Sequence, residues 1–229
     1  MGDKQKCFKR ELQSLLGSLS KCVRYARFFL NRLLDTLRQH KDSKIITLGA
    51  EAKRDIAWFR KFVCQFNGTS FFVKDKVDKE VHLDACLTGM GASFDGKIYG
   101  AGIPEKFRKF DIAALEMLNI LIATRIWAKD WENRTMEVDC DNLSVVNILC
   151  SGKTKNSMLA TISRNLFMTA SKYDIFLKVS HIPGKSNQVA DLLSRWQHTK
   201  DNFEKLQQFL PSFTWEKIEE SHFELDENI

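Results

Sequence analysis

The first third of the chain has hydrophobic positions at helical spacing. In residues 10–40, leucines and phenylalanines recur every three or four positions, with arginines between them. Residues 50–63 repeat the pattern and are followed by the turn sequence Phe-Asn-Gly-Thr at residues 66–69. The pattern predicts helices over 10–40 and 50–63, with a turn ending the second region.

From residue 81 the spacing of hydrophobic positions changes to alternation. Residues 81–87, 89–94 and 97–103 each have the pattern of a strand. Asp95-Gly96 separates the last two, and this dipeptide favours a two-residue hairpin turn. We therefore predict three consecutive antiparallel strands.

The rest of the central region alternates between helix and strand patterns. Asp111 precedes a helix from Ile112 to about Trp127 that is apolar on nearly every face, as is typical of a buried helix. The further elements are a strand at 135–140, helices at 142–150 and 157–172, a strand at 174–182 and a helix at 188–196. This order predicts an α/β fold with a mixed five-stranded sheet, in which parallel strands extend the antiparallel three and helices flank the sheet.

Charge divides the chain into three regions. The net charge is +6 and the sequence pI is about 9.0. Residues 1–80 hold 18 basic and 9 acidic side chains (+9), residues 81–196 hold 14 and 12 (+2), and residues 197–229 hold 3 and 8 (−5). We therefore expect a helical segment over 1–75, an α/β domain over 76–196 and an acidic C-terminal tail over 197–229. The basic region suits either a surface that follows a phosphate backbone or a solvated helical face.

Composition also bears on location. No run of 18 apolar residues is present, and the first six residues are too charged for a secretory signal peptide. The six cysteines lack Cys-x-x-Cys and zinc-ligand spacings, which favours reduced thiols. We predict an intracellular protein of the cytoplasm or nucleus, neither secreted nor bound to a membrane.

Four carboxylates lie where the pattern predicts a core: Asp84, Glu116, Asp141 and Asp191. An unpaired buried carboxylate is costly. Each of the four could be paired with a basic side chain or turned to solvent. Alternatively, they converge and bind hard divalent cations such as Mg²⁺, and a pair of such ions suits hydrolysis of a phosphodiester.

The strings around these carboxylates resemble type 1 ribonuclease H. Residues 83–92 (LDACLTGMGA) resemble the family's first strand, residues 112–116 (IAALE) its first helix, and residues 138–142 (VDCDN) its Asp-Asn strand end. Residues 181–195 (HIPGKSNQVADLLSR) resemble the closing motif of retroelement members. The acids are separated by 32, 25 and 50 residues. The resemblance implies a ribonuclease H-like sheet.

The N-terminal region resembles part of a reverse transcriptase. Residues 11–19 resemble the helix that opens the thumb, and residues 55–59 and 66–68 resemble the segment that joins thumb to ribonuclease H in DIRS/Ngaro-type retrotransposons. No Tyr-x-Asp-Asp polymerase motif is present. We expect the ribonuclease H part of a retroelement polyprotein without the polymerase palm and fingers, and hence no DNA synthesis by this chain alone.

The resemblance implies an endonuclease that hydrolyses the RNA strand of RNA/DNA hybrids. Asp84, Glu116, Asp141 and Asp191 would hold two Mg²⁺ ions, for which Mn²⁺ can substitute. The partners implied are the hybrid and the rest of a reverse transcriptase.

Three polar residues are candidate substrate contacts, Asn142, Lys185 and Asn187, and each could equally be an ordinary loop or cap residue. Cellular members carry a histidine that assists product release where Lys185 stands here; His181 lies too early in the sequence to replace it. The alternatives are an idle or domesticated nucleic-acid-binding module, a related nuclease of this fold that acts on DNA, and an inert remnant.

Overall fold

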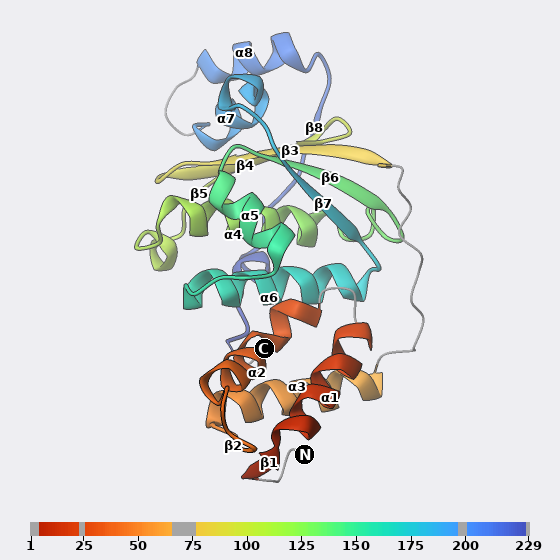
Figure 1. Cartoon of the computed structure of the whole chain (residues 1–229). Helices are drawn as coiled ribbons and strands as arrows, with labels where there is room; N and C mark the ends of the chain where they lie inside the picture. The colour runs from red at the N-terminus through yellow and green to blue at the C-terminus, as the bar shows by residue number, and fades with distance from the viewer. Residues whose placement is uncertain (1–4, 23–25, 66–76, 197–200, 228–229) are drawn as a thin grey trace. The chain divides into compact units, whose positions relative to one another are not determined.

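The computed structural model of the protein describes residues 5–22, 26–65, 77–196 and 201–227. The chain forms two compact units, one of residues 1–72 with 226–229 and one of residues 73–225 (Figure 1). The turn predicted at residues 66–69 lies outside the described residues. None of the described helices is both long enough and apolar enough to cross a membrane.

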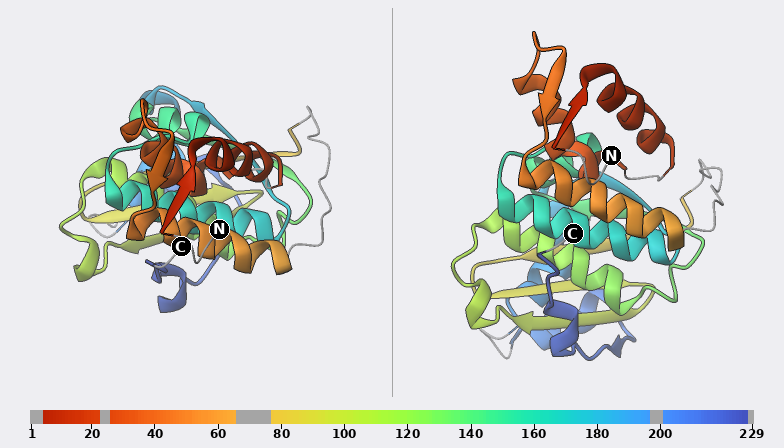
Figure 2. Two further views of the ribbon diagram at one scale, coloured as in Figure 1. Left: turned by 60° about the horizontal axis from the view of Figure 1, so that its bottom comes forward. Right: turned by 90° about the horizontal axis from the view of Figure 1, so that it is seen from below.

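The first unit consists of helices and a small sheet. Its helices are α1 (Lys9–Cys22), α2 (Ala26–Gln39) and α3 (Ala50–Gln65), and strands β1 (Lys6–Phe8) and β2 (Ile45–Thr47) pair antiparallel (Figure 2). Leu12, Leu33 and Ile46 are fully buried. Trp58 of α3 stacks on Phe29 of α2 with ring centroids 3.9 Å apart. The predicted helical regions are confirmed, whereas the three-residue strands are too short to produce a recognisable alternation.

The second unit is built on a six-stranded sheet of order β7-β6-β3-β4-β5-β8. Its strands are β3 (Lys79–Ala85), β4 (Gly89–Phe94), β5 (Lys97–Gly102), β6 (Thr135–Cys140), β7 (Phe176–His181) and β8 (Thr214–Trp215). β3, β4 and β5 form the predicted antiparallel series, and β6 and β7 extend it in parallel. The Asp95-Gly96 turn has positive φ at both residues, 51° and 75°. The predicted mixed sheet is therefore confirmed, but the predicted count of five strands is wrong because β8 adds a sixth.

Helices cover both faces of this sheet. α4 (Ile112–Ile126) and α6 (Ser157–Lys172) lie on one face, and α7 (Gln188–Ser194) and α8 (Asp201–Phe209) lie on the other (Figure 1). α5 (Leu143–Ser151) packs beside β7 and α4. The Asp111 side chain caps α4 by accepting the Ala114 N–H at 2.8 Å. Eleven consecutive residues of α4 are buried, as its apolar pattern predicts.

Glycines let α7 lie directly on the sheet. A Cβ at Gly91 would collide with the Leu193 side chain, and a Cβ at Gly89 would collide with the Ser194 carbonyl. Gly100 would likewise meet the Leu193 carbonyl, at 2.9 Å. The glycines of β4 and β5 therefore set the distance between α7 and the end of β3, where Asp84 lies.

The C-terminal segment packs onto this second unit. Leu206 of α8 is fully buried with Ile98 and Leu193. The Arg125 guanidinium of α4 donates to the carbonyls of His222 and Glu224 at 2.7 and 2.6 Å. The segment that charge alone marks as an acidic tail thus supplies a helix, the sixth strand and the 3₁₀ turn η3 (Glu220–Phe223).

Candidate active site

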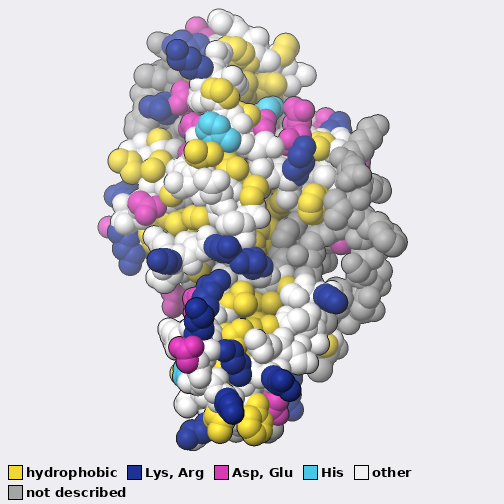
Figure 3. Space-filling model, viewed as in Figure 1, with side chains coloured by type: hydrophobic (Ala, Val, Ile, Leu, Met, Phe, Trp, Pro, Cys, Tyr) yellow, Lys and Arg dark blue, Asp and Glu magenta, His cyan; other side chains and the backbone are white. Residues whose placement is uncertain are grey.

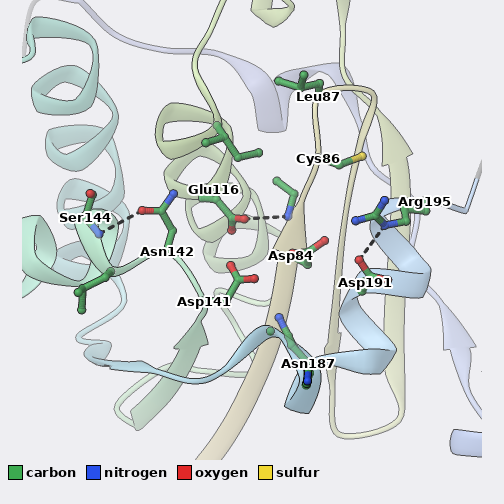
Figure 4. Close-up of a pocket in the computed structure, with 15 residues that line it drawn as sticks. Asp84, Cys86, Leu87, Glu116, Asp141, Asn142, Ser144, Asn187, Asp191 and Arg195 are labelled. Carbon is green, nitrogen blue, oxygen red and sulfur yellow. Dashed lines mark hydrogen bonds and ion pairs between the residues drawn. The ribbon is translucent and has the colours of Figure 1, made fainter.

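Three carboxylates from distant parts of the sequence meet where the neighbouring central strands β3 and β6 end. Asp84 lies on β3, Asp141 directly follows β6, and Glu116 is in the second turn of α4. One carboxylate oxygen of each lies within 4.8 Å of the others (Figure 4). β3 and β6 run parallel with His82 opposite Asp139, so Asp84 and Asp141 both lie two residues beyond a paired position. The register of these two strands therefore brings the two aspartates side by side at the same end of the sheet.

Burial and mutual repulsion perturb these carboxylates. Glu116 is 2% exposed and Asp84 is 7% exposed. Burial, followed by repulsion from Asp84 and Asp141, raises the pKa of Glu116 to about 9. Burial also raises the pKa of Asp84 to about 6, although the Ser194 hydroxyl donates to it at 2.5 Å and acts in the opposite direction. The arrangement favours a cation, because positive charge relieves both the repulsion and the cost of burial.

The donor atoms suit a hard divalent cation. The cluster supplies carboxylate oxygens, which are the ligands that Mg²⁺ prefers in proteins. Glu116 Oε1 accepts the Ala85 N–H at 3.4 Å, whereas its Oε2 is buried with no hydrogen-bond partner in the described part of the chain. A bound cation would satisfy this oxygen, so the residues present fit such an ion.

The fourth predicted acid lies apart from this cluster. Asp191 of α7 lines the same pocket, which has a volume of about 780 Å³, but it is not among the three carboxylates that lie within 4.8 Å of one another. Its carboxylate accepts the Arg195 Nε–H at 2.7 Å and is about half exposed (Figure 4). The structure thus brings three of the four acids together and places the fourth on the wall of the same pocket.

The three predicted substrate contacts differ in their surroundings. Asn142 caps α5, since its Oδ1 accepts the N–H groups of Ser144 and Val145 at 3.1 and 3.3 Å. Asn187 is 3% exposed and donates to the Leu83 carbonyl at 2.8 Å. Lys185 is exposed in the 3₁₀ turn η2 (Gly184–Ser186) and lines the pocket. Lys185 is the charged residue of the three, and its side chain is exposed.

Asn119 is a supporting residue that sequence reasoning missed. It is fully buried on α4 and donates through Nδ2 to the carbonyls of Asp84 and Gly91 at 2.8 and 2.9 Å. Its Oδ1 accepts the Tyr99 hydroxyl at 2.7 Å. One amide therefore ties α4 to three adjacent strands beside the carboxylates. The sequence did carry a signal for this role, because Asn119 is a polar residue in a mostly apolar helix, three positions after Glu116.

Comparison with known proteins agrees with this architecture. Residues 95–197 match the family model described as "Reverse transcriptase-like", a range that includes Glu116, Asp141 and Asp191. The six-stranded mixed sheet of the second unit, flanked by helices, resembles the ribonuclease H fold, and this unit is called the ribonuclease H unit below. Three of the four carboxylates that the sequence motifs single out lie in the cluster of this unit, Asp84, Glu116 and Asp141.

Solved structures that show some similarity to this chain include one from an archaeon and one from a virus. Ribonuclease H1 from Halobacterium salinarum NRC-1 is 17% identical over 50% of this chain and 92% of that chain, with a TM-score of 0.43. The foamy viral protease-reverse transcriptase in complex with dsDNA is 14% identical over 79% of this chain, with a TM-score of 0.33. The present chain spans 39% of that viral chain. No curated protein matches this sequence.

Proposed function

We propose that the ribonuclease H unit hydrolyses the RNA strand of RNA/DNA hybrids with divalent metal ions, as the ribonuclease H part of a retroelement reverse transcriptase. The observation that carries the proposal is the meeting of Asp84, Glu116 and Asp141 within 4.8 Å, at the sheet edge of a ribonuclease H fold. Two buried carboxylates with raised pKa values are a costly arrangement that a cation would stabilise.

The carboxylates would hold the ions, with Asp191 as the fourth ligand. Bound Mg²⁺ or Mn²⁺ supplies an activated water and stabilises the charge that develops on the phosphate oxygens. The protein contributes position: Asn119 fixes the backbone of Asp84, and Ser194 orients its carboxylate. Lys185, exposed beside the carboxylates, suits a contact with a neighbouring phosphate.

The first unit suits a supporting role in nucleic-acid binding. Residues 1–72 of this unit carry 15 basic and 6 acidic side chains, and Lys and Arg side chains gather over its helices on the visible face (Figure 3). Such a surface binds a phosphate backbone without sequence preference and in a salt-dependent manner. The motifs of residues 11–19 and 55–59 support a thumb-like and connecting segment, of the kind found in DIRS/Ngaro-type elements.

A cleavage assay tests the proposed activity. The whole chain is incubated with an end-labelled RNA/DNA hybrid, duplex RNA or duplex DNA, in Mg²⁺, Mn²⁺ or EDTA. We expect cleavage of the RNA strand of the hybrid alone, in either metal and not in EDTA. Cleavage of duplex DNA would instead indicate a different nuclease of this fold, and tight binding without cleavage would indicate a binding module.

Variants assign the activity to the site. Asp84→Asn and Asp141→Asn should each abolish cleavage while thermal unfolding shows an intact fold. Glu132→Gln is a matched control, because this exposed carboxylate is not among the residues that line the pocket. A cleaving Asp84→Asn or Asp141→Asn variant would show that the assignment is wrong.

A further inference from the structure

A second group of metal-ligating side chains lies on the sheet, outside the candidate active site. Glu80 and His82 of β3 and Asp139 of β6 each place one ligand atom within 4.8 Å of the other two. His82 and Asp139 are directly opposite each other in the parallel register of the two strands. The His82 Nδ1 and the Asp139 carboxylate oxygen are 3.0 Å apart. We call Glu80, His82 and Asp139 the histidine cluster.

The histidine cluster lies one pleat away from the carboxylates of the candidate active site. Alternate residues of a strand share a face, so Glu80 and His82 lie on the same face of β3 as Asp84. Val81 and Leu83, which lie between them in the sequence, are fully buried on the opposite face. Two residues of a strand span about 6.6 Å, and the two clusters share no residue. The histidine cluster is therefore a separate group of side chains.

The negative charge of the histidine cluster is not balanced by a permanent cation. The neighbouring Glu137 has such a partner, because its carboxylate lies 3.2 Å from the Lys178 ammonium and also accepts the Ser180 hydroxyl at 2.7 Å. Among the described residues, by contrast, no Lys or Arg is paired with Glu80 or Asp139. Asp139 is 9% exposed, and its imidazole partner is charged only when protonated. A metal ion would supply the charge that this buried carboxylate lacks.

The donor atoms of the histidine cluster differ from those of the active-site carboxylates. They are one imidazole nitrogen and two carboxylate oxygens, a set that suits Zn²⁺ and related transition-metal ions, whereas Mg²⁺ prefers oxygen ligands alone. The ligands come from two adjacent strands of one sheet, which hold side chains more precisely than loops do. Glu80 is exposed and the His82 side chain is 41% exposed, so an ion can enter from solvent.

We infer that the histidine cluster of Glu80, His82 and Asp139 is a second cation site, which binds Zn²⁺ or a related transition-metal ion. Three protein ligands leave a coordination position for water. The bound ion would link β3 to β6 one pleat before Asp84 and Asp141, and would therefore stabilise the strand pair that carries them. The inference goes beyond the proposed function, because the binding of this ion does not require cleavage of a hybrid.

Isothermal titration calorimetry of the whole chain with Zn²⁺ in excess Mg²⁺ tests the inference. Mg²⁺ competes for the all-oxygen carboxylate cluster, so we expect the remaining Zn²⁺ binding to come from the histidine cluster. His82→Gln should weaken this binding by about 100-fold or more, because loss of a ligand costs more than loss of its outer-shell partner. Glu80→Gln, at an exposed position, should also weaken it. His40→Gln is the matched control, since this histidine of the first unit belongs to no cluster of metal-ligating residues in the described part of the chain.

NMR of nitrogen-labelled imidazoles identifies the ligand directly in the wild-type chain. Zn²⁺ should shift the Nδ1 resonance of His82 and leave those of His40 unchanged. This measurement decides the question even if His82→Gln is less stable, and thermal unfolding in EDTA should be alike for wild type, Glu80→Gln and His40→Gln.

The outcomes separate this inference from the proposed function. Equal Zn²⁺ affinity of wild type and His82→Gln, or an unshifted His82 Nδ1 resonance, would show that the two side chains of the His82–Asp139 pair only hydrogen-bond to each other. A chain that cleaves the hybrid but gives either result contradicts this inference alone. A chain that binds Zn²⁺ through His82 but does not cleave the hybrid contradicts the proposed function alone.

Discussion

Arg195 is paired with Asp191 one helical turn earlier, with 2.7 Å between the arginine Nε and the carboxylate oxygen. The pair lies at the C-terminal end of α7, where hydrogen bonding to Asp191 raises the pKa of Arg195. Asp191 is the acid that the structure leaves outside the cluster of Asp84, Glu116 and Asp141. A cation that recruits Asp191 must therefore compete with the Arg195 guanidinium for the same carboxylate.

Replacing Arg195 should strengthen metal binding. Arg195→Gln removes the competing charge, so the affinity for Mn²⁺ should rise about two- to fivefold, which corresponds to the free energy of an exposed ion pair. Isothermal titration calorimetry measures this affinity without reference to activity. Arg195→Lys keeps the charge and is the matched control, with an affinity close to that of the wild type. Unchanged or weaker Mn²⁺ binding in Arg195→Gln would contradict the competition.

The raised carboxylate pKa values predict an unusual pH dependence of stability. Glu116 titrates near pH 9 in the folded chain but near its ordinary value of 4.5 when unfolded, so the folded state binds more protons between these values. Stability should therefore fall as pH rises from about 5 to 8 in EDTA. Asp84, with its pKa at about 6, contributes in the same direction over the lower part of this range.

Thermal unfolding in EDTA at pH 5 and pH 8 measures this effect. We expect Tm to be several degrees lower at pH 8, and Mg²⁺ to restore much of the loss. Glu116→Gln should flatten the pH dependence, because a neutral amide carries no titrating charge, and should weaken stabilisation by Mg²⁺. Glu132→Gln should behave as the wild type. An equal Tm at the two pH values in the wild-type chain would contradict the burial and mutual repulsion that raise these two pKa values.

The glycines under α7 should be intolerant of substitution. Gly91→Ala places a methyl group where Leu193 packs, so α7 must shift together with Asp191 and Ser194. We expect destabilisation of about 1–3 kcal/mol in urea unfolding, typical of overpacking, and loss of most cleavage. Gly17→Ala is the control: it lies in α1 with open space around its Cβ position and should stabilise the chain by up to about 1 kcal/mol. Equal stability of Gly91→Ala and wild type would contradict the close approach of α7.

Much of the fold of the ribonuclease H unit could be predicted from the sequence, because its turns, helix starts and buried segments have clear local sequence patterns. Asp95-Gly96 marks the hairpin, Asp111 marks the start of α4, and the unbroken apolar run marks α4 as buried. The order of the sequence motifs predicted that Asp84, Glu116 and Asp141 converge, as the structure shows. The parallel register of β3 and β6 gives the physical reason for the two aspartates.

What could not be predicted depends on side-chain geometry or on very short elements. The two residues of β8 cannot show an alternating pattern, so the sixth strand was missed. Asp191 lies outside the cluster of the other three acids and is paired with Arg195, and the four-residue spacing allowed this pair to be foreseen.

The packing of the C-terminal segment gives a final prediction. Leu206 is fully buried and packs against Ile98 and Leu193. Leu206→Ala should therefore destabilise the ribonuclease H unit by about 2–5 kcal/mol. Phe209→Ala, on the exposed side of the same helix, should cost far less. Urea unfolding followed by tryptophan fluorescence compares the two, because Trp196 packs against the Leu206 cluster and reports on it directly. A neutral Leu206→Ala would mean that the segment is only loosely attached; a large loss would make α8 part of the structural support of α7, and through it of Asp191 and Ser194.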